Sequence, residues 1–304
     1  MLNLPSPIQE ISSKFIRDKK IRVFVKRDDL IHPEISGNKW RKLSENIKEM
    51  EASRKKGILS FGGAFSNHLF ALAASGKAFG FQTIGLVRGE ESSTNSTLSF
   101  CQSQGMKLVF LSRADYKFKN SAAYLALLKN KYPEFLILPE GGANSNGRLG
   151  CQEIYKEIIN YKMHNFDYLF LSAGTGTTAA GICSNHDNAM KLGIVPALKG
   201  EWMEEEISKS LNMKLTDNKN FRFFYDYHFG GYAKYDTQLI DFINQFKLNF
   251  DIPLDPIYTG KLFYGVFDLI KKGYFKAGMN ISILHSGGLQ GIDGFNARHG
   301  ILIY

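Results

Sequence analysis

The chain has 304 residues, of which 44% are hydrophobic, and it carries a formal net charge of +9 at pH 7. A chain of this length can bury a full core and is expected to form two lobes. Its lysines and arginines form no stripe interleaved with aromatic residues, so we expect no nucleic-acid partner. No apolar run approaches membrane-spanning length, so we expect no membrane association.

The three cysteines, Cys101, Cys151 and Cys183, lie far apart in the sequence, with no CxxC spacing. This spacing argues against a disulfide framework or a structural zinc site, and it favours a reducing compartment. Residues 1–13 lack the charged start and apolar run that are typical of a signal peptide. We therefore expect a cytoplasmic protein.

Short apolar runs alternate with helical patterns along almost the whole chain. In chain order, the predicted strands cover residues 21–26, 58–61, 81–88, 107–111, 135–138, 168–171, 194–198, 221–227 and 281–285. The predicted helices cover residues 39–56, 69–79, 97–104, 122–132, 151–161, a segment from about 179, 204–211, 237–246 and 261–271. The strands read as continuous apolar runs, as in a parallel sheet covered on both faces. The alternation predicts an α/β fold with two doubly wound open-sheet lobes.

The glycine-rich run at residues 141–147 is interpreted as the return of the chain between the lobes. We predict a large domain made of residues 1–46 and 151–304, and a smaller α/β domain, 47–150, that closes over the ligand. Ligands of doubly wound folds bind at the carboxyl ends of the strands. Three polar, glycine-containing segments occupy that position, at residues 62–68, 173–178 and 285–288.

The first chemical candidate is Lys39, at the start of a predicted helix. Asn38 is a good N-cap, which places Lys39 in the first turn. The positive end of the helix dipole and partial burial both favour a neutral amine. Such an amine can form a Schiff base with a carbonyl compound. The alternative is an ordinary lysine on a surface helix.

The run from Ser172 to Thr178 is a strand-to-helix turn rich in glycine and hydroxyl side chains. Its backbone amides and the start of the next helix predict an anion site that fits one phosphate monoester. It is neither a Walker loop nor a GxGxxG segment. The alternative is a tight turn with capping residues.

Two further segments are candidates for ligand contacts. In Ser66-Asn67-His68, Ser66 could move a proton and Asn67 could hydrogen-bond a phenolic oxygen, but Ser66 could also be a helix cap and His68 a structural histidine. In His285-Ser286-Gly287-Gly288, a hydroxyl could face a ring nitrogen. Tyr258, just before a predicted helix, could stack on a flat ring or simply pack. We find no spacing of metal ligands.

Pyridoxal phosphate accounts for these features together, because it needs a lysine for its aldehyde, a cradle for one phosphate and a polar partner for its ring nitrogen. The sequence resembles the 1-aminocyclopropane-1-carboxylate (ACC) deaminase and D-cysteine desulfhydrase family, which are fold type II pyridoxal-phosphate enzymes related to the tryptophan synthase β chain. The resemblance lies in these segments, in order: Lys26 to Leu30, Gly37 to Leu43, Ser66 to His68, Ala173 to Thr177, Leu254 to Lys261 and His285 to Gly288.

The resemblance implies a role for each matched residue. Lys39 matches the Schiff-base lysine, Ser66 the serine beside the substrate, and Asn67 the residue that bonds the phenolic oxygen. The matches to the phosphate contacts are Lys42, Gly174, Thr175, Gly176, Thr177 and Thr178. Tyr258 matches the aromatic residue at the cofactor ring, and Tyr232 matches a second active-site tyrosine. Because of its place after Asn67, we also expect His68 to contact the substrate. The family also implies a small amino-acid substrate and a homodimer. Residues 295–299 match no part of the pattern.

The ring-nitrogen partners distinguish the activities within this family. ACC deaminases resemble one another in carrying Glu and Leu where this chain has Thr259 and Ser286. A hydroxyl holds the nitrogen protonated less well than a carboxylate does, which favours β-elimination of a good leaving group. We therefore expect a D-cysteine desulfhydrase-like lyase. The alternatives are an ACC deaminase and a cofactor-binding protein with little turnover.

Overall fold

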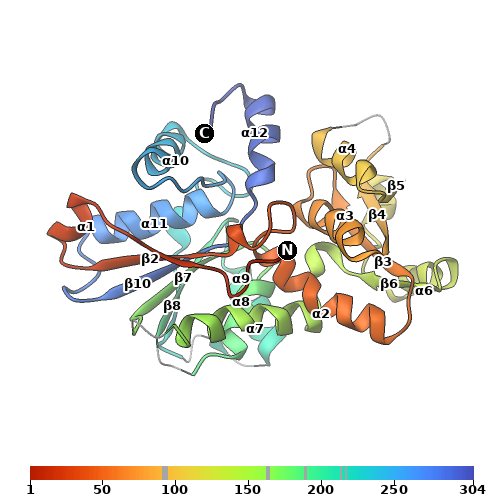
Figure 1. Cartoon of the computed structure of the whole chain (residues 1–304), viewed down its shortest axis with the longest axis horizontal. Coiled ribbons are helices and arrows are strands. Elements are labelled where there is room, and N and C mark those ends of the chain that lie inside the picture. The colour runs from red at the N-terminus through yellow and green to blue at the C-terminus, as the bar shows by residue number, and fades with distance from the viewer. Residues whose placement is uncertain (91–94, 162–164, 188–189, 213, 216–217) are drawn as a thin grey trace.

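The computed structural model of the chain describes residues 1–90, 95–161, 165–187, 190–212, 214–215 and 218–304. The chain folds into two lobes, each built on its own sheet (Figure 1). The larger lobe has a sheet with the order β1-β2-β10-β7-β8-β9, and β1 alone runs antiparallel to its neighbour. These strands span Ile8–Ile11, Arg22–Arg27, Asn280–His285, Tyr168–Ala173, Lys191–Pro196 and Phe221–Phe223.

The large sheet is covered on both faces because its strands alternate between two apolar cores. Val23 and Val25 of β2 point into one core and Phe24 into the other. The first core is completed by α10 (Thr237–Phe250) and α11 (Thr259–Lys271). The second is completed by α7 (Ser145–Ile159), α8 (Thr177–Ser184) and α9 (Trp202–Leu211).

The smaller lobe has a parallel sheet with the order β5-β4-β3-β6. Its strands span Lys107–Leu111, Gln82–Arg88, Gly57–Gly63 and Phe135–Leu138. One face packs against α2 (Asn38–Ala52), α3 (Asn67–Phe79) and α4 (Ser96–Ser103). The other face packs against α5 (Arg113–Tyr116) and α6 (Ala122–Lys131). The two sheets are covered by helices on both faces and are parallel apart from β1, which confirms the predicted α/β architecture.

Several predicted boundaries were wrong for identifiable reasons. Helix α7 begins at Ser145, not at Cys151, because Asn144 caps it and its early glycines pack instead of turning. A Cβ at Gly150 would overlap the carbonyl oxygen of Arg41, so glycine permits the close approach of α7 to α2. The strand predicted at 221–227 ends at Phe223 and continues as the 3₁₀ turn Tyr225–Tyr227.

The sequence patterns did not predict β1 (Ile8–Ile11), α1 (Lys14–Asp18), α5 or α12 (Ile292–His299). These elements are too short to show a clear period. Helix α12 lies beside α10, on the side toward the smaller lobe (Figure 1). The ring of Phe65 is 3.3 Å from the point that a Cβ on Gly294 would occupy. The unmatched residues 295–299 therefore belong to a helix that meets the loop before α3.

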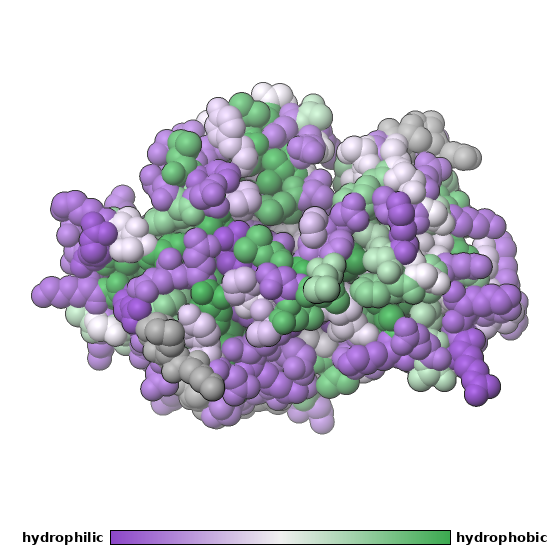
Figure 2. All heavy atoms as spheres, viewed as in Figure 1, coloured by the Kyte–Doolittle hydropathy of each residue, from purple (hydrophilic) through white to green (hydrophobic). Residues whose placement is uncertain are grey.

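The strands of the larger sheet lie within residues 8–27 and 168–285, and those of the smaller sheet lie within residues 57–138. The chain passes between the two sheets through α2 and α7. The domain limits 47 and 150 fall inside these two helices and stay a prediction. Hydrophilic side chains cover the outer ends of the two lobes on the face shown in Figure 2. Among the described residues, no helix is long and apolar enough to cross a membrane.

Candidate active site

The start of α2 is joined directly to the end of β10. The backbone N–H of Asn38 donates to the carbonyl oxygen of Ser286 at 3.1 Å. Gly37, at φ +63°, makes this approach possible, because a Cβ there would overlap the same carbonyl oxygen. Two of the segments predicted to carry chemistry therefore meet, although they are far apart in the sequence.

Lys39 lies in the first turn of α2, but the cap differs from the prediction. Gly37 is the N-cap and Asn38 is the first helical residue, so the Asn38 side chain is free for other contacts. Its Oδ1 accepts a hydrogen bond from Lys39 Nζ at 2.7 Å. Burial, followed by the charge of Lys42, lowers the pKa of Lys39 from 10.5 to about 7. Near neutral pH, a large share of Lys39 is thus a free amine.

The turn between β7 and α8 meets the same helix start. Asn38 Nδ2 donates to Thr178 Oγ1 at 3.3 Å, and the hydroxyls of Thr175 and Thr177 lie 3.2 Å apart. Gly176, at φ +76°, is the N-cap of α8, so its conformation favours glycine. The turn brings hydroxyl groups and the positive end of a helix to one place, as the phosphate prediction requires.

A buried ionic network fixes α2 against the larger lobe. Arg41 donates to Asp28 at 2.8 Å and to Glu157 at 2.6 Å, and Lys26 donates to Glu157 at 2.5 Å. Arg41, Asp28 and Lys26 are all buried. Breaking such a pair leaves an uncompensated charge, so this network holds the Lys39 helix in one position.

Lys42 provides a test of whether the site fits pyridoxal phosphate. Its side chain is 4% exposed, and its ammonium group has no hydrogen bond or ion pair with any residue that the structure describes. Burial lowers its pKa. Lys42 lies one helical turn from Lys39, and a bound phosphate group would neutralise its buried charge. The side chains of the site therefore fit pyridoxal phosphate.

We predict that Lys42→Met has opposite effects on stability and on cofactor binding. The apoprotein should unfold at an equal or higher denaturant concentration, because a buried unpaired ammonium is costly. Pyridoxal phosphate should bind about 10²-fold more weakly, because a charge-assisted contact is lost. Denaturant unfolding of the apoprotein and absorbance titration with pyridoxal phosphate measure the two effects.

The pH dependence provides a second check of Lys42. The folded chain lowers its pKa, so the unfolded chain binds more protons as the pH approaches 10.5, and apoprotein stability rises with pH in that range. Lys42→Met should flatten this rise. The exposed Lys48→Met on the same helix is the control and should change neither quantity. Unchanged cofactor affinity in Lys42→Met would refute the phosphate assignment.

The segment after β3, residues 66–68, caps helix α3 and also contributes side chains to the candidate site. Ser66 is the N-cap of α3, and its Oγ accepts from the backbone N–H of Leu69 at 3.2 Å. Its own proton is donated to no residue that the structure describes, so it is available to a ligand. The side chain of Asn67 lies 3.4 Å from the position of a Cβ on Gly288, which places it beside the segment after β10.

His68 is almost fully enclosed, at 2% exposure. Its Nε2 lies 2.9 Å from Ser60 Oγ, while its buried Nδ1 has no hydrogen-bond partner among the described residues. Burial and the charges of Lys39 and Lys42 lower its pKa to about 3. His68 is therefore neutral and adds no positive charge beside the two lysines; its predicted substrate contact stays a prediction.

Tyr258 lies against the turn between β7 and α8. Its Cε1 is 2.7 Å from the position of a Cβ on Gly174, so only glycine permits the contact. The ring of Tyr232 meets Tyr258 edge to face, with 6.3 Å between ring centroids. Burial raises the pKa of Tyr258. The two aromatic residues named from the resemblance thus form a pair beside the turn.

The two predicted hydroxyl partners of the ring nitrogen differ in their surroundings. Thr259 is wholly buried, and its Oγ1 donates to Asp255 Oδ1 at 2.7 Å. Ser286 Oγ makes no hydrogen bond to a described residue. The structure therefore leaves the Ser286 hydroxyl free for a ligand, whereas that of Thr259 is occupied by a carboxylate.

The sequence reasoning overlooked three neighbours of the site. Asp255 caps the start of α11 by accepting from the backbone N–H groups of Ile257, Tyr258 and Thr259. The Asp-Pro pair before a helix is a capping signal that could have revealed it. Cys151 lies close enough to Lys42 to influence its pKa, and a Cβ on Gly142 would contact Lys42 and His68. Nothing local in the sequence indicated these two.

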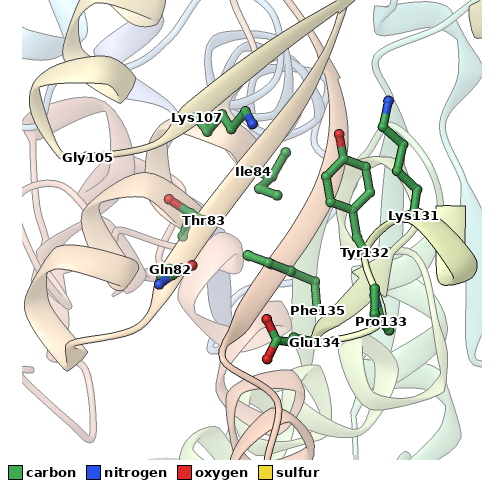
Figure 3. Close-up of a pocket in the computed structure, with 10 residues that line it drawn as sticks. All are labelled: Gln82, Thr83, Ile84, Gly105, Lys107, Lys131, Tyr132, Pro133, Glu134 and Phe135. Carbon is green, nitrogen blue, oxygen red and sulfur yellow. The ribbon is translucent and has the colours of Figure 1, made fainter.

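A separate open cavity of about 400 Å³ lies at the amino ends of β4, β5 and β6 (Figure 3), whereas the site segments follow the carboxyl ends of their strands. Its lining residues are Gln82, Thr83, Ile84, Gly105, Lys107, Lys131, Tyr132, Pro133, Glu134 and Phe135. None of the predicted site residues lines it. Within the described part of the chain, no group of three His, Cys, Asp or Glu side chains could hold a metal ion.

The fold and the donor set define a pyridoxal-phosphate enzyme of fold type II. The family model described as "Pyridoxal-phosphate dependent enzyme" matches residues 2–287, so the chain belongs to this family. The structure of the processed threonine deaminase isoform 2 from Solanum lycopersicum superposes with a TM-score of 0.68 at 14% identity, covering 98% of this chain and 84% of that one, and so shares the fold.

Within that class, the chain belongs to the ACC deaminase and D-cysteine desulfhydrase family. It is 30% identical to a Pyrococcus horikoshii protein named "Putative 1-aminocyclopropane-1-carboxylate deaminase", over 94% of this chain and 90% of that protein. It is 26% identical to the mitochondrial "Bifunctional D-cysteine desulfhydrase/1-aminocyclopropane-1-carboxylate deaminase" of Arabidopsis thaliana, over 96% and 78%. A structure described as an ACC deaminase homologue superposes with a TM-score of 0.80 at 27% identity, over 97% and 94%.

These comparisons confirm the predicted family, fold type and cofactor. The protein is a pyridoxal-phosphate-dependent enzyme of the lyase or deaminase type. The roles of the individual residues stay predictions that rest on the geometry described above.

Proposed function

We propose that the protein is a lyase of the D-cysteine desulfhydrase type, which eliminates the β-substituent of a D-amino acid. The observation that carries the proposal is the pair of hydroxyl side chains, Thr259 and Ser286, at the positions where the family resemblance places the partners of the ring nitrogen. Of the two, the hydroxyl of Ser286 is the one free to meet a ligand.

The two hydroxyls bear on which reaction is favoured. Bound pyridoxal phosphate draws electron density from Cα of the amino acid, more strongly when its ring nitrogen is protonated. Ser286 cannot hold a proton on that nitrogen as firmly as a directly bonded carboxylate. A substrate with a good leaving group at Cβ compensates for the weaker pull. ACC has neither such a group nor a hydrogen on Cα.

The side chains supply the proton transfers that an elimination needs. Lys39, with a pKa of about 7, can take the Cα proton on Nζ. Ser66 can hydrogen-bond the departing sulfur with the proton that it donates to no described residue. For D-cysteine, the Cα–H and Cβ–S bonds break, sulfur leaves with the electron pair, and one water enters. The products are pyruvate, ammonia and hydrogen sulfide.

ACC deamination is the second candidate. The Pyrococcus relative carries that name, and the Arabidopsis relative is named for both activities. A carboxylate also lies behind one of the two predicted partners of the ring nitrogen, because the Thr259 hydroxyl donates a hydrogen bond to Asp255. A cofactor-binding protein with little turnover is the remaining alternative.

A substrate panel tests the proposal. Purified holoenzyme should release pyruvate from D-cysteine or β-chloro-D-alanine with a kcat/KM at least about 10-fold higher than from ACC, which corresponds to about 1.4 kcal/mol of transition-state stabilisation. L-cysteine and D-serine complete the panel, and Lys39→Ala is the background control. A higher kcat/KM for ACC would make ACC deamination the function. No turnover of any member would favour the binding protein.

We further propose a homodimer located in the cytoplasm. The dimer comes from the family resemblance, and the location from three cysteines that are all buried and free. Light scattering of the holoenzyme and imaging of the tagged full chain would test the two statements separately.

A further inference from the structure

The third residue of α11, Lys261, is a buried cation with no carboxylate partner among the residues that the structure describes. It is 0% exposed, and no residue that the structure describes forms an ion pair with it. Burial lowers its pKa to about 8. A charged side chain this deeply buried is normally paired, so its surroundings require an explanation.

Three backbone carbonyl groups surround the Lys261 ammonium instead. Nζ donates to Gly231 O at 2.7 Å, to His228 O at 2.8 Å and to Ala197 O at 3.4 Å. Ala197 follows β8, and the other two carbonyls belong to a turn, residues 228–233, which we call the Tyr232 turn. One side chain thus joins the start of α11, the end of β8 and the Tyr232 turn.

The Tyr232 turn has a backbone that needs such support. Phe229 and Ala233 have φ values of +52° and +54°, which non-glycine residues rarely adopt, and Gly230 and Gly231 lie at +90° and +120°. Its internal hydrogen bonds include Gly231 N–H to His228 O at 3.0 Å. Residues in such conformations persist when the surrounding structure holds them there.

The turn carries an aromatic side chain to the candidate active site. Tyr232, between Gly231 and Ala233, contacts Tyr258, and Tyr258 lies against Gly174 in the turn between β7 and α8. Tyr232 itself is 57% exposed, so its own packing does little to fix it. Its position therefore depends on the backbone that Lys261 holds.

We propose that Lys261 is a positioning residue, whose ammonium group holds the Tyr232 turn so that Tyr232 stays beside Tyr258 at the substrate side of the site. This inference rests on the proposed function in one respect, namely that Tyr232 lies near the bound substrate. Lys261 itself contacts backbone oxygens and is assigned no chemical step. The family resemblance gives it no role, although it ends one of the matched segments.

Hydrogen exchange tests the support of the turn without any assay of activity. In wild-type holoenzyme, the amides of Gly231 and Lys234, which are bonded within this segment, should be protected. In Lys261→Met, which keeps the length and removes the charge, they should exchange about 10-fold faster or more, while the amides of β10 stay unchanged. The exposed Lys271→Met on the same helix is the matched control. Rates typical of an unprotected turn in the wild type would overturn the proposal, whether or not the variant folds.

A double-mutant cycle tests the link to Tyr232. Lys261→Met should raise KM about 10-fold for whichever amino acid the holoenzyme turns over, with little change in kcat or in cofactor affinity. Tyr232→Phe should have a smaller effect in the Lys261→Met background than in the wild type. Additive effects would overturn the proposal. If Lys261→Met does not fold, Lys261→Gln, which keeps a donor but no charge, replaces it in the same cycle. A substrate panel without turnover would refute the proposed function and leave the exchange result intact.

Discussion

Lys39→Ala should abolish turnover while the protein stays folded. Its one hydrogen bond among the described residues is to its neighbour Asn38, so the loss of the side chain costs little stability. It is also the amine that would join the cofactor and take the Cα proton. Losing a single positioned proton-transfer group costs about 10²–10⁴-fold. Losing the covalent attachment as well should bring turnover to the background rate.

Covalent labelling checks this assignment directly. Borohydride treatment of wild-type holoenzyme should fix the cofactor to the peptide that contains Lys39, as mass spectrometry would show. Lys48→Ala, an exposed lysine on the same helix, should leave both labelling and turnover unchanged. Label on any other lysine, or full activity in Lys39→Ala, would contradict the assignment.

Gly37→Ala should lower both stability and cofactor binding by a large amount. Gly37 has φ +63° and ψ −145°, a region that is essentially restricted to glycine and costs a side chain about 1–3 kcal/mol. A methyl group there would also overlap the carbonyl oxygen of Ser286, which is a backbone atom and cannot turn aside. Either α2 or the end of β10 must move. We expect the free energy of unfolding to fall by about 3 kcal/mol or more.

The consequence for function follows from the same contact. The Asn38 N–H to Ser286 O bond brings the Lys39 helix to the segment that carries Ser286, so displacing it separates the two halves of the site. Denaturant unfolding and a pyridoxal-phosphate titration measure the two effects. Gly80→Ala is the control, because its φ is +75° but a Cβ there meets nothing within 4 Å. It should cost only about 1–2 kcal/mol and leave cofactor affinity unchanged. Equal effects of the two substitutions would show that strain, not the contact, dominates.

Long periodic segments explain why much of the fold could be predicted. The strands β3, β4 and β7 were predicted within a few residues, because a parallel strand covered on both faces must be a continuous apolar run. The same holds for α10, whose apolar residues recur at helical spacing. The short edge strand β1 and the short helix α12 show no such period, so nothing in the sequence alone predicted them.

Some parts of the candidate site could likewise be recognised from the sequence, whereas others depend on contacts between distant segments. Lys39, Asn67 and the turn from Ser172 to Thr178 could be recognised because each lies next to a strand end or a helix start, where backbone groups are unpaired. Asn38 was recognised for the wrong reason: it was predicted to cap the helix, and it instead hydrogen-bonds Lys39 and Thr178. A glycine can start a helix when a neighbouring backbone requires it, and that neighbour, Ser286, lies far away in the sequence.

The sequence by itself determined the α/β class, the cofactor and the family, because these depend on local patterns and on short matched segments. Only the tertiary structure decided the electrostatic state of the site. Lys42 has no partner among the described residues, Lys261 is enclosed by carbonyl groups, and Thr259 is hydrogen-bonded to Asp255, because of what the fold places beside them. The pKa of Lys39 falls for the same reason, since burial depends on residues from several elements at once. Burial and pairing are properties of neighbours in space, and a sequence read in order records only neighbours along the chain.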